Sequence, residues 1–268
     1  MSFSFDIPKI SSNLRRDGFA IIEDYLTKAQ ITPLLDEFEK AFLLSEQADT
    51  KRSVLNGEYA LLPKNLLQKS SDSFPELLGF LNNPKLHEIV KSYFNLSSCE
   101  KINGHVEVEI NFSSGKSSAS LPHFDKLPAL KIFLFLTDIT SNSGATYVYP
   151  KTYKQTRRFI FDSLSHLNDF NKLENFISEK NLSGIDRVDF ECKKGTLLIA
   201  DTAGLHGGGC MTEKGSTRKV IRATTWYLPK SFDSLSQQAA LIADDQFKQE
   251  EVNLINTNHF CPYSEICN

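Results

Sequence analysis

The feature that most constrains the fold is a change in hydrophobic periodicity near residue 102. Before it, from about residue 14 to residue 95, the pattern is mostly helical: residues 28–43 and 84–93 are predicted helices, behind a short strand at 18–22. After it, polar and apolar residues alternate along 105–112, which is typical of a half-buried strand. The chain therefore predicts a mainly β protein with flanking helices.

Further short strands are predicted after residue 112, separated by turn clusters such as the Ser-Asn-Ser-Gly run at 141–144. They cover 130–136, 146–149, 188–191, 196–200 and 218–228. Many short strands with such turns indicate a barrel or a jelly roll. Helical spacing returns at 162–181, where we predict a helical insertion.

The organisation of the 268 residues favours one domain, because no internal repeat and no long Gly/Ser-rich or Pro-rich linker divides them. We predict a single domain over residues 1–268. It comprises a helical N-terminal part at about 14–95, a jelly-roll core at about 102–228 and a C-terminal tail at 229–268.

Charge and cysteine content exclude several classes of protein. The net charge of −3 offers no general attraction to nucleic acid or to anionic lipid. Five cysteines without a CxxC pair favour reduced thiols in a cytoplasm, and Cys261 and Cys267 receive no assigned role. No signal peptide is apparent, and the longest apolar stretch, 132–136, is too short to span a membrane. We expect a small-molecule partner, no nucleic acid and no membrane; the oligomeric state stays open.

Two of the six histidines, His123 and His206, lie at positions that packing of a hydrophobic core does not explain. His123 lies just before a strand, and the i, i+2 spacing puts His123 and Asp125 on one side of extended backbone. His206 follows an apolar strand and precedes three glycines, which permit close approach of the backbone to a bound group. Two imidazoles and one carboxylate on a face hold a divalent first-row metal and leave three positions open, as in non-haem Fe(II) oxygenases.

Further motifs around these residues together resemble the phytanoyl-CoA dioxygenase (PhyH-like) family of Fe(II)- and 2-oxoglutarate-dependent oxygenases. They are DGFAII at 17–22, HFD at 123–125, SNSGA at 141–145, GTLLIAD at 195–201, LHG at 205–207 and RKVI at 218–221. The resemblance spans about residues 14–228 and implies a double-stranded β-helix (jelly-roll, cupin-like) core. It further implies that His123, Asp125 and His206 bind Fe(II), that 2-oxoglutarate chelates the metal and that O2 takes the remaining site.

Three more residues are candidates to bind 2-oxoglutarate. Arg218 offers a planar guanidinium to the distal carboxylate. Arg222 shares its face in a regular strand, so it is either the alternative anchor or a partner for a substrate carboxylate. Asn111 lies where the resemblance implies an amide that contacts the co-substrate.

The sequence departs from the family pattern at two places. Position 208, often a hydroxyl residue near the co-substrate, is Gly208, and the segment PKTY at 150–153 lacks the usual histidine. The carboxylate of Asp125 argues for hydroxylation or a related oxidation, because a halogenase has alanine or glycine there. Lys131, inside an apolar strand, either lines a polar cavity or lies on a solvated face, and so do His105, Glu107 and Glu109.

The resemblance implies hydroxylation of an unactivated C–H bond in a small molecule, with release of succinate and CO2. Desaturation, epoxidation or cyclisation on the same core is the alternative among enzymes. An alternative from another class is a jelly-roll binding or regulatory protein that keeps the metal-site residues without turnover. Succinate formation coupled to substrate distinguishes an enzyme from the binding or regulatory protein, and product analysis separates the enzymatic outcomes. The prime substrate, whether a free metabolite, a carrier-bound acyl group or a natural-product intermediate, stays open.

Overall fold

The computed structural model describes residues 6–47, 51–54, 57–62, 69–94, 103–112, 122–125, 129–154, 156, 185–212 and 217–226. The insertion expected at 162–181 and the tail expected at 229–268 lie outside these residues. The described helices are α1 (Ile7–Asp17), α2 (Lys28–Gln47), α4 (Pro75–Leu81), α5 (Pro84–Phe94) and a short 3-10 helix at Ser71–Ser73. The described strands are β1 (Phe19–Ile22), β2 (Lys51–Val54), β3 (Gly57–Leu62), β4 (Asn103–Phe112), β5 (Ala129–Phe135), β6 (Thr146–Val148), β7 (Val188–Asp189), β8 (Leu197–Asp201), β9 (His206–Gly208) and β10 (Thr217–Trp226).

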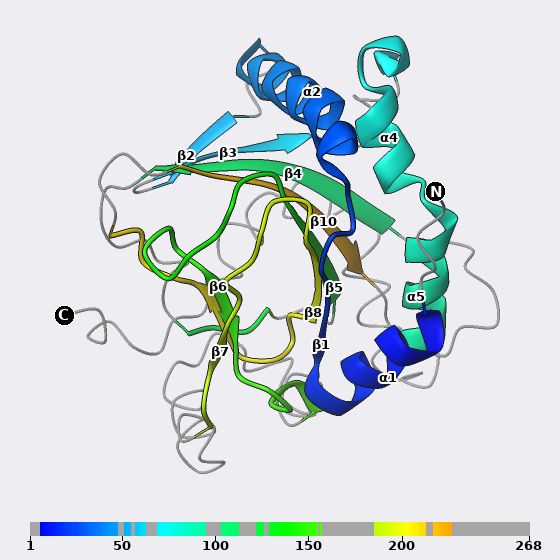
Figure 1. The fold of residues 1–268 in the computed structure, drawn as a ribbon, viewed down its shortest axis with the longest axis vertical. Helices are drawn as coiled ribbons and strands as arrows, with labels where there is room; N and C mark the ends of the chain where they lie inside the picture. The colour runs from blue at the N-terminus through cyan, green and yellow to red at the C-terminus, as the bar shows by residue number, and fades with distance from the viewer. Residues whose placement is uncertain are drawn as a thin grey trace, which may run out of the picture.

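These strands form two antiparallel sheets. The large sheet has the order β1-β8-β5-β10-β4-β3-β2, and the small sheet has the order β7-β6-β9. A single β-bridge between His123 and His206 adds the segment 122–125 beside β9. Apart from β2 and β3, most neighbouring strands are not consecutive in sequence, and the chain passes repeatedly from one sheet to the other, as in a jelly roll (Figure 1). The predicted double-stranded β-helix core is confirmed.

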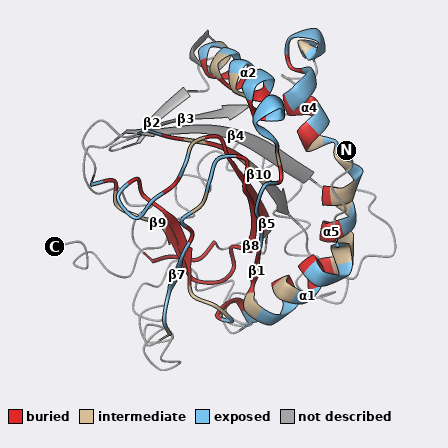
Figure 2. Cartoon of the chain, viewed as in Figure 1, coloured by how far each residue is buried: buried red, intermediate tan, exposed pale blue. Residues whose placement is uncertain are grey.

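The large sheet carries its helices on one face. Alternate residues of β5, among them Leu130, Ile132 and Leu134, join a core with buried apolar residues of α1, α2, α4 and α5. The intervening residues Phe133 and Phe135 join a second core with residues of β6, β8 and β10. We call the first face of the large sheet the outer face and the second the inner face. Buried residues follow the strands and line the sheet-facing side of the helices (Figure 2).

The N-terminal part is less helical than predicted. β2 and β3 form an antiparallel hairpin, and β3 pairs with β4, so this hairpin extends the large sheet. Backbone hydrogen bonds to the long β4 explain two strands in a region whose general pattern is helical, because sheet pairing overrides local preference. The helices 28–43 and 84–93 and the strand at 18–22 are confirmed to within a few residues.

The passage from α1 into β1 depends on glycine. Gly18 ends α1 in the left-handed conformation, with φ of 88°, and its N–H donates to the carbonyl of Leu14. A Cβ at this position would lie 2.8 Å from Cδ1 of Tyr153, so both the conformation and the space exclude a side chain.

Among the described helices none has the length and apolar character that crossing a membrane requires.

Candidate metal centre

Three buried side chains meet between the two sheets. One ligand atom each from His123, Asp125 and His206 lies within 4.8 Å of the others. The two histidines are neighbours on paired backbone: the N–H of His123 donates to the carbonyl of His206 at 2.9 Å, and the reverse bond measures 2.8 Å. Pairing across the edge of the small sheet therefore brings together residues that are 83 positions apart in the sequence.

The turn at 201–206 holds two of the three side chains in place. The N–H of Asp125 donates to the carbonyl of Thr202 at 2.8 Å, so the same turn carries His206 and fixes the backbone of Asp125. The turn is itself supported from outside, because the hydroxyl of Thr152 accepts the N–H of Leu205 at 2.9 Å. These hydrogen bonds fix the backbone of Asp125 and His206 without a bound metal.

Asp201 connects this turn to the helical layer. Its carboxylate accepts the hydroxyl of Tyr93, on α5, at 2.5 Å and the N–H of Ala203 at 3.1 Å. Tyr93 and Asp201 are both buried, so neither group exchanges its partner for water in the folded state. This link could not be predicted from the sequence, because Tyr93 lies on the apolar face of an amphipathic helix like an ordinary core residue.

The imidazole of His206 is neutral and is held in one tautomer. Its Nδ1 lies 2.9 Å from the carbonyl oxygen of Gly204, which must accept a hydrogen bond, so Nδ1 carries the proton and the lone pair is on Nε2. Burial, together with the neighbouring His123, lowers the pKa of His206 to about 3. Gly207, next in the strand, leaves room for Tyr147: a Cβ there would lie 2.5 Å from the tyrosine oxygen.

Lys131 proves to be a buried residue on the inner face. Its ammonium Nζ lies 2.8 Å from Oδ2 of Asp125, and the two side chains are only 11% and 8% exposed. Of the two alternatives that the sequence left open for Lys131, the solvated face is therefore wrong. The side chains of His105, Glu107 and Glu109 lie outside the described part of the chain.

Arg218 lies on the inner face and is 8% exposed. In the register of β10 with β4 it stands directly opposite Asn111, so two of the three residues predicted from sequence to contact the co-substrate are neighbours across the sheet. One guanidinium nitrogen, NH1, donates to the carbonyl of Gly144, in the loop between β5 and β6. The inner face thus holds an arginine whose direction is fixed by the neighbouring loop.

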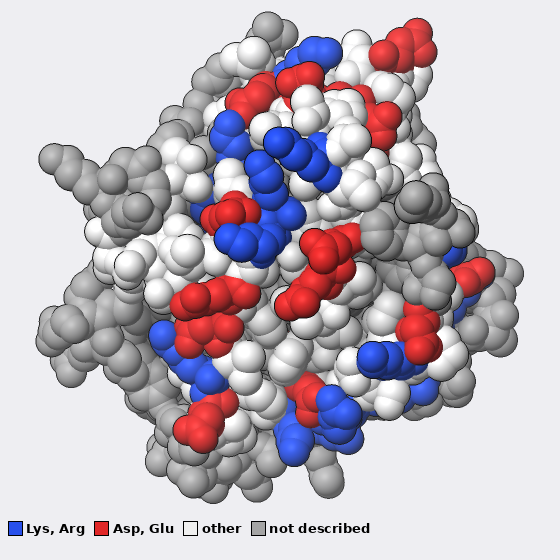
Figure 3. All heavy atoms as spheres, in the orientation of Figure 1, with Lys and Arg blue, Asp and Glu red and all other residues white. Residues whose placement is uncertain are grey.

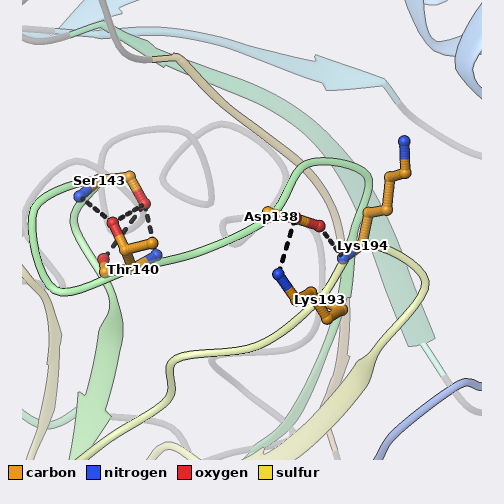
Figure 4. Close-up of polar contacts among 5 residues, drawn as sticks. All are labelled: Asp138, Thr140, Ser143, Lys193 and Lys194. Carbon is orange, nitrogen blue, oxygen red and sulfur yellow. Dashed lines mark hydrogen bonds and ion pairs between the residues drawn. The ribbon is translucent and has the colours of Figure 1, made fainter.

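Hydrogen bonds at both ends hold this loop (Figure 4). Asp138 accepts the backbone N–H of Lys194 at 2.9 Å and lies 3.2 Å from Nζ of Lys193, and these contacts lower the pKa of its carboxyl group. Ser143 accepts the N–H of Thr140 at 2.7 Å and donates back to its carbonyl at 3.2 Å. The loop therefore presents the carbonyl of Gly144 to Arg218 from a fixed position.

Arg222 is half-buried and lies four residues further along β10. Its register partners are Glu107 on β4 and Phe133 on β5. The structure thus places both arginines on the inner face, and pairs Arg218 but not Arg222 with Asn111.

Thr146 is a residue that the sequence did not single out. Thr146 pairs with Gly208 in the small sheet, and Val148 pairs with His206. Thr146 therefore lies two residues along β6 from the position opposite His206. It is 7% exposed. Only the strand register reveals it, because a threonine in a short apolar strand is unremarkable by pattern.

The fold is shared with solved structures of low sequence identity. The epimerase SnoN, in complex with Fe3+, alpha ketoglutarate and nogalamycin RO, is 14% identical with a TM-score of 0.56, over 82% of this chain and 83% of that one. The non-heme alpha ketoglutarate dependent carbocyclase SnoK from nogalamycin biosynthesis is 13% identical with a TM-score of 0.55, over 81% and 83%. EctD from S. alaskensis, with bound Fe, is 14% identical with a TM-score of 0.56, over 84% and 79%. No family model and no curated protein sequence matches the chain. These likenesses establish the fold.

Proposed function

We propose that the protein is a non-haem Fe(II)- and 2-oxoglutarate-dependent dioxygenase that oxidises a small molecule. The observation that carries this proposal is the buried group of His123, Asp125 and His206 between the two sheets, with its ligand atoms within 4.8 Å of one another. Arg218 supports it as a buried cation on the same inner face, and Asn111 is its register partner on β4. A likeness to the phytanoyl-CoA dioxygenase family in particular rests on the sequence motifs.

The donor set fits Fe(II). Two imidazoles and one carboxylate are the ligands of the facial triad, and His206 is neutral at physiological pH because its pKa lies far below 7. His123, Asp125 and His206 would hold the ion. Bound Fe(II), together with 2-oxoglutarate and O2, would supply an oxidant for a C–H bond while 2-oxoglutarate becomes succinate and CO2.

The protein's own residues bind and orient the co-substrate. Arg218 pairs with the distal carboxylate, for which a planar guanidinium is suited. Thr146 lies about 7 Å along the strand from the level of His206, roughly the reach of a five-carbon diacid that is held by the metal at its other end. Its hydroxyl donates to the same carboxylate and takes the place of the hydroxyl that Gly208 lacks.

Hydroxylation of an unactivated C–H bond is the reaction that we propose. SnoN and SnoK are described as an epimerase and a carbocyclase, so the fold also accommodates other outcomes. The partner that we propose is a small molecule, because a net charge of −3 offers no general attraction to nucleic acid. On the face shown in Figure 3, basic and acidic side chains lie beside one another. We infer a cytoplasmic location from the cysteine pattern of the sequence, because five cysteines without a CxxC pair favour reduced thiols.

Formation of succinate tests the proposal. Protein loaded with Fe(II) and supplied with 2-oxoglutarate, O2 and a panel of small molecules should form succinate above the level of His206→Ala. Lys219→Met is a matched control, because Lys219 is paired with Glu39 and lies away from the metal group. Succinate at the His206→Ala level with every compound, together with retained iron, would favour the binding or regulatory alternative.

A further inference from the structure

Lys131 is the one charged residue in the strand β5, whose sequence is ALKIFLF. The strand needs no lysine for packing, because Leu130 and Ile132 fill the outer face and Phe133 continues the inner face. A lysine this deeply buried is costly to desolvate, and an apolar residue of similar size would often be at least as stable. Its buried ion pair indicates that it acts on its partner, Asp125.

Asp125 is held at two points, by a hydrogen bond of its backbone and by the ion pair of its carboxylate with Lys131. The N–H of Asp125 donates to the carbonyl of Thr202 at 2.8 Å, which fixes where its side chain starts. Nζ of Lys131 lies 2.8 Å from Oδ2, which fixes the rotation of the carboxylate about its last bond. Lys131 itself is fixed by the pairing of β5 with both β8 and β10, where it stands opposite Ala200 and Thr224.

We propose that Lys131 is a positioning residue that makes Asp125 a one-oxygen ligand. A carboxylate binds a metal through one or both oxygens. With two histidines and a single oxygen, an octahedral ion keeps three open positions, enough for a two-point keto acid and O2. With both oxygens bound it keeps two. By holding Oδ2, Lys131 preserves the position that 2-oxoglutarate needs, and this inference rests on the proposed function.

The test uses Co(II), whose visible absorption reports coordination number and which is stable in air. Lys131→Met should bind Co(II) no more weakly than the wild type, because no ligand is removed. Its Co(II) absorption should differ from that of the wild type. The affinity of the Co(II)-loaded protein for 2-oxoglutarate should fall by about tenfold or more, the scale typical of residues that orient a metal ligand. Lys131→Arg, which keeps the charge and the donors, should recover towards the wild-type values.

Two backgrounds separate positioning from simple loss of structure. In Asp125→Asn, the side chain has a single oxygen for the metal, so adding Lys131→Met should not change the Co(II) spectrum further. Lys219→Met removes a lysine from another ion pair of the large sheet and should match the wild type throughout. If Lys131→Met does not fold, as judged by thermal melting, Lys131→Gln takes its place, because it keeps a polar atom at the buried site.

Each outcome decides the inference. An unchanged spectrum and unchanged 2-oxoglutarate affinity in Lys131→Met would overturn it, and so would a further spectral change in the Asp125→Asn background. Loss of Co(II) binding in Lys131→Met would also contradict it, because Lys131 would then be needed to form the site. A wild-type protein that binds no Co(II) would instead overturn the proposed function, and this inference with it.

Discussion

The two faces of the large sheet are built from the same strands but present different kinds of side chain. On the outer face β5, β8 and β10 present aliphatic side chains, such as Leu134 and Ile221, that contact the helices. On the inner face the same strands present Lys131, Arg218 and Arg222 among phenylalanines. The outer face follows mainly from hydrophobic burial, and its charged residues Asp201 and Lys219 are paired with Tyr93 and Glu39 of the helical layer. The inner face places charged groups where burial is unfavourable, which is typical of a ligand site.

The largest difference between the faces is expected at the buried arginine. If Arg218 pairs with the distal carboxylate, Arg218→Ala should weaken 2-oxoglutarate binding by about 3–5 kcal/mol, a hundredfold or more, without loss of Fe(II). The matched variant Arg222→Ala should act mainly on the prime substrate or on stability. Anaerobic titration of the Fe(II) protein, followed by its metal-to-ligand absorption, compares the two. Normal affinity in Arg218→Ala with lost affinity in Arg222→Ala would transfer the anchor to Arg222.

An outer-face truncation should show the opposite behaviour. Leu134 is fully buried, so Leu134→Ala should lower the free energy of unfolding by about 2–5 kcal/mol through lost contacts and a residual cavity. The folded protein should keep its affinity for 2-oxoglutarate, because Leu134 faces away from the metal group. Chemical denaturation measures the first quantity and the anaerobic titration the second. A weakened co-substrate affinity would show that the two faces are not independent.

The buried histidine predicts a pH dependence that belongs to the inner face. The unfolded chain binds a proton at His206 near pH 6.5, whereas the folded chain does not until about pH 3. Lowering the pH of the metal-free protein from 7 to 5 therefore favours unfolding, by about 2 kcal/mol. Denaturation in the presence of a chelator measures this slope. His206→Gln should lose less stability over the same interval; an equal loss would assign the dependence to other groups.

The smallest effect is expected in the loop that carries Gly144. Asp138 is half-exposed, so Asp138→Asn should cost less than about 1 kcal/mol of stability, since surface ion pairs contribute little. The asparagine oxygen still accepts the N–H of Lys194, so Arg218 should keep its direction and the protein its 2-oxoglutarate affinity. A tenfold loss of that affinity would mean that the inner face depends on the charge of this loop.

Elements whose hydrophobic residues follow a strand or a helix period could be predicted from the sequence. The predicted strands near β4, β5, β8 and β10 and the helices α2 and α5 are all present. The strands β2, β3 and β9 were missed for physical reasons, and the helix α1 was missed although it had a local signal. The hairpin β2–β3 exists through pairing with β4, and the glycine-rich β9 through pairing with β6, so neither has a strong local signal. The helix α1 did have one: Asp6 caps it and a proline follows.

The candidate site divides in the same way. The HxD spacing placed His123 beside Asp125 from the sequence, and the later glycine-rich turn pointed to His206. Our proposal that Arg218 and not Arg222 is the anchor draws on the register, which sets Arg218 opposite Asn111. Thr146 and the ion pair of Lys131 with Asp125 depend on which strands face one another. Such contacts between distant segments leave no periodic trace in a single sequence.

The most direct measurement of the central claim is an anaerobic titration of the wild-type protein with Fe(II) and 2-oxoglutarate. Chelation of the metal by the keto acid end should produce a metal-to-ligand absorption band that saturates at one Fe(II) per chain. His123→Ala and His206→Ala should lose tight iron binding, and with it the band, because two ligands do not complete the face. A wild-type protein that forms no band, or variants that keep full iron stoichiometry and the band, would contradict the assignment of His123, Asp125 and His206 as the iron site.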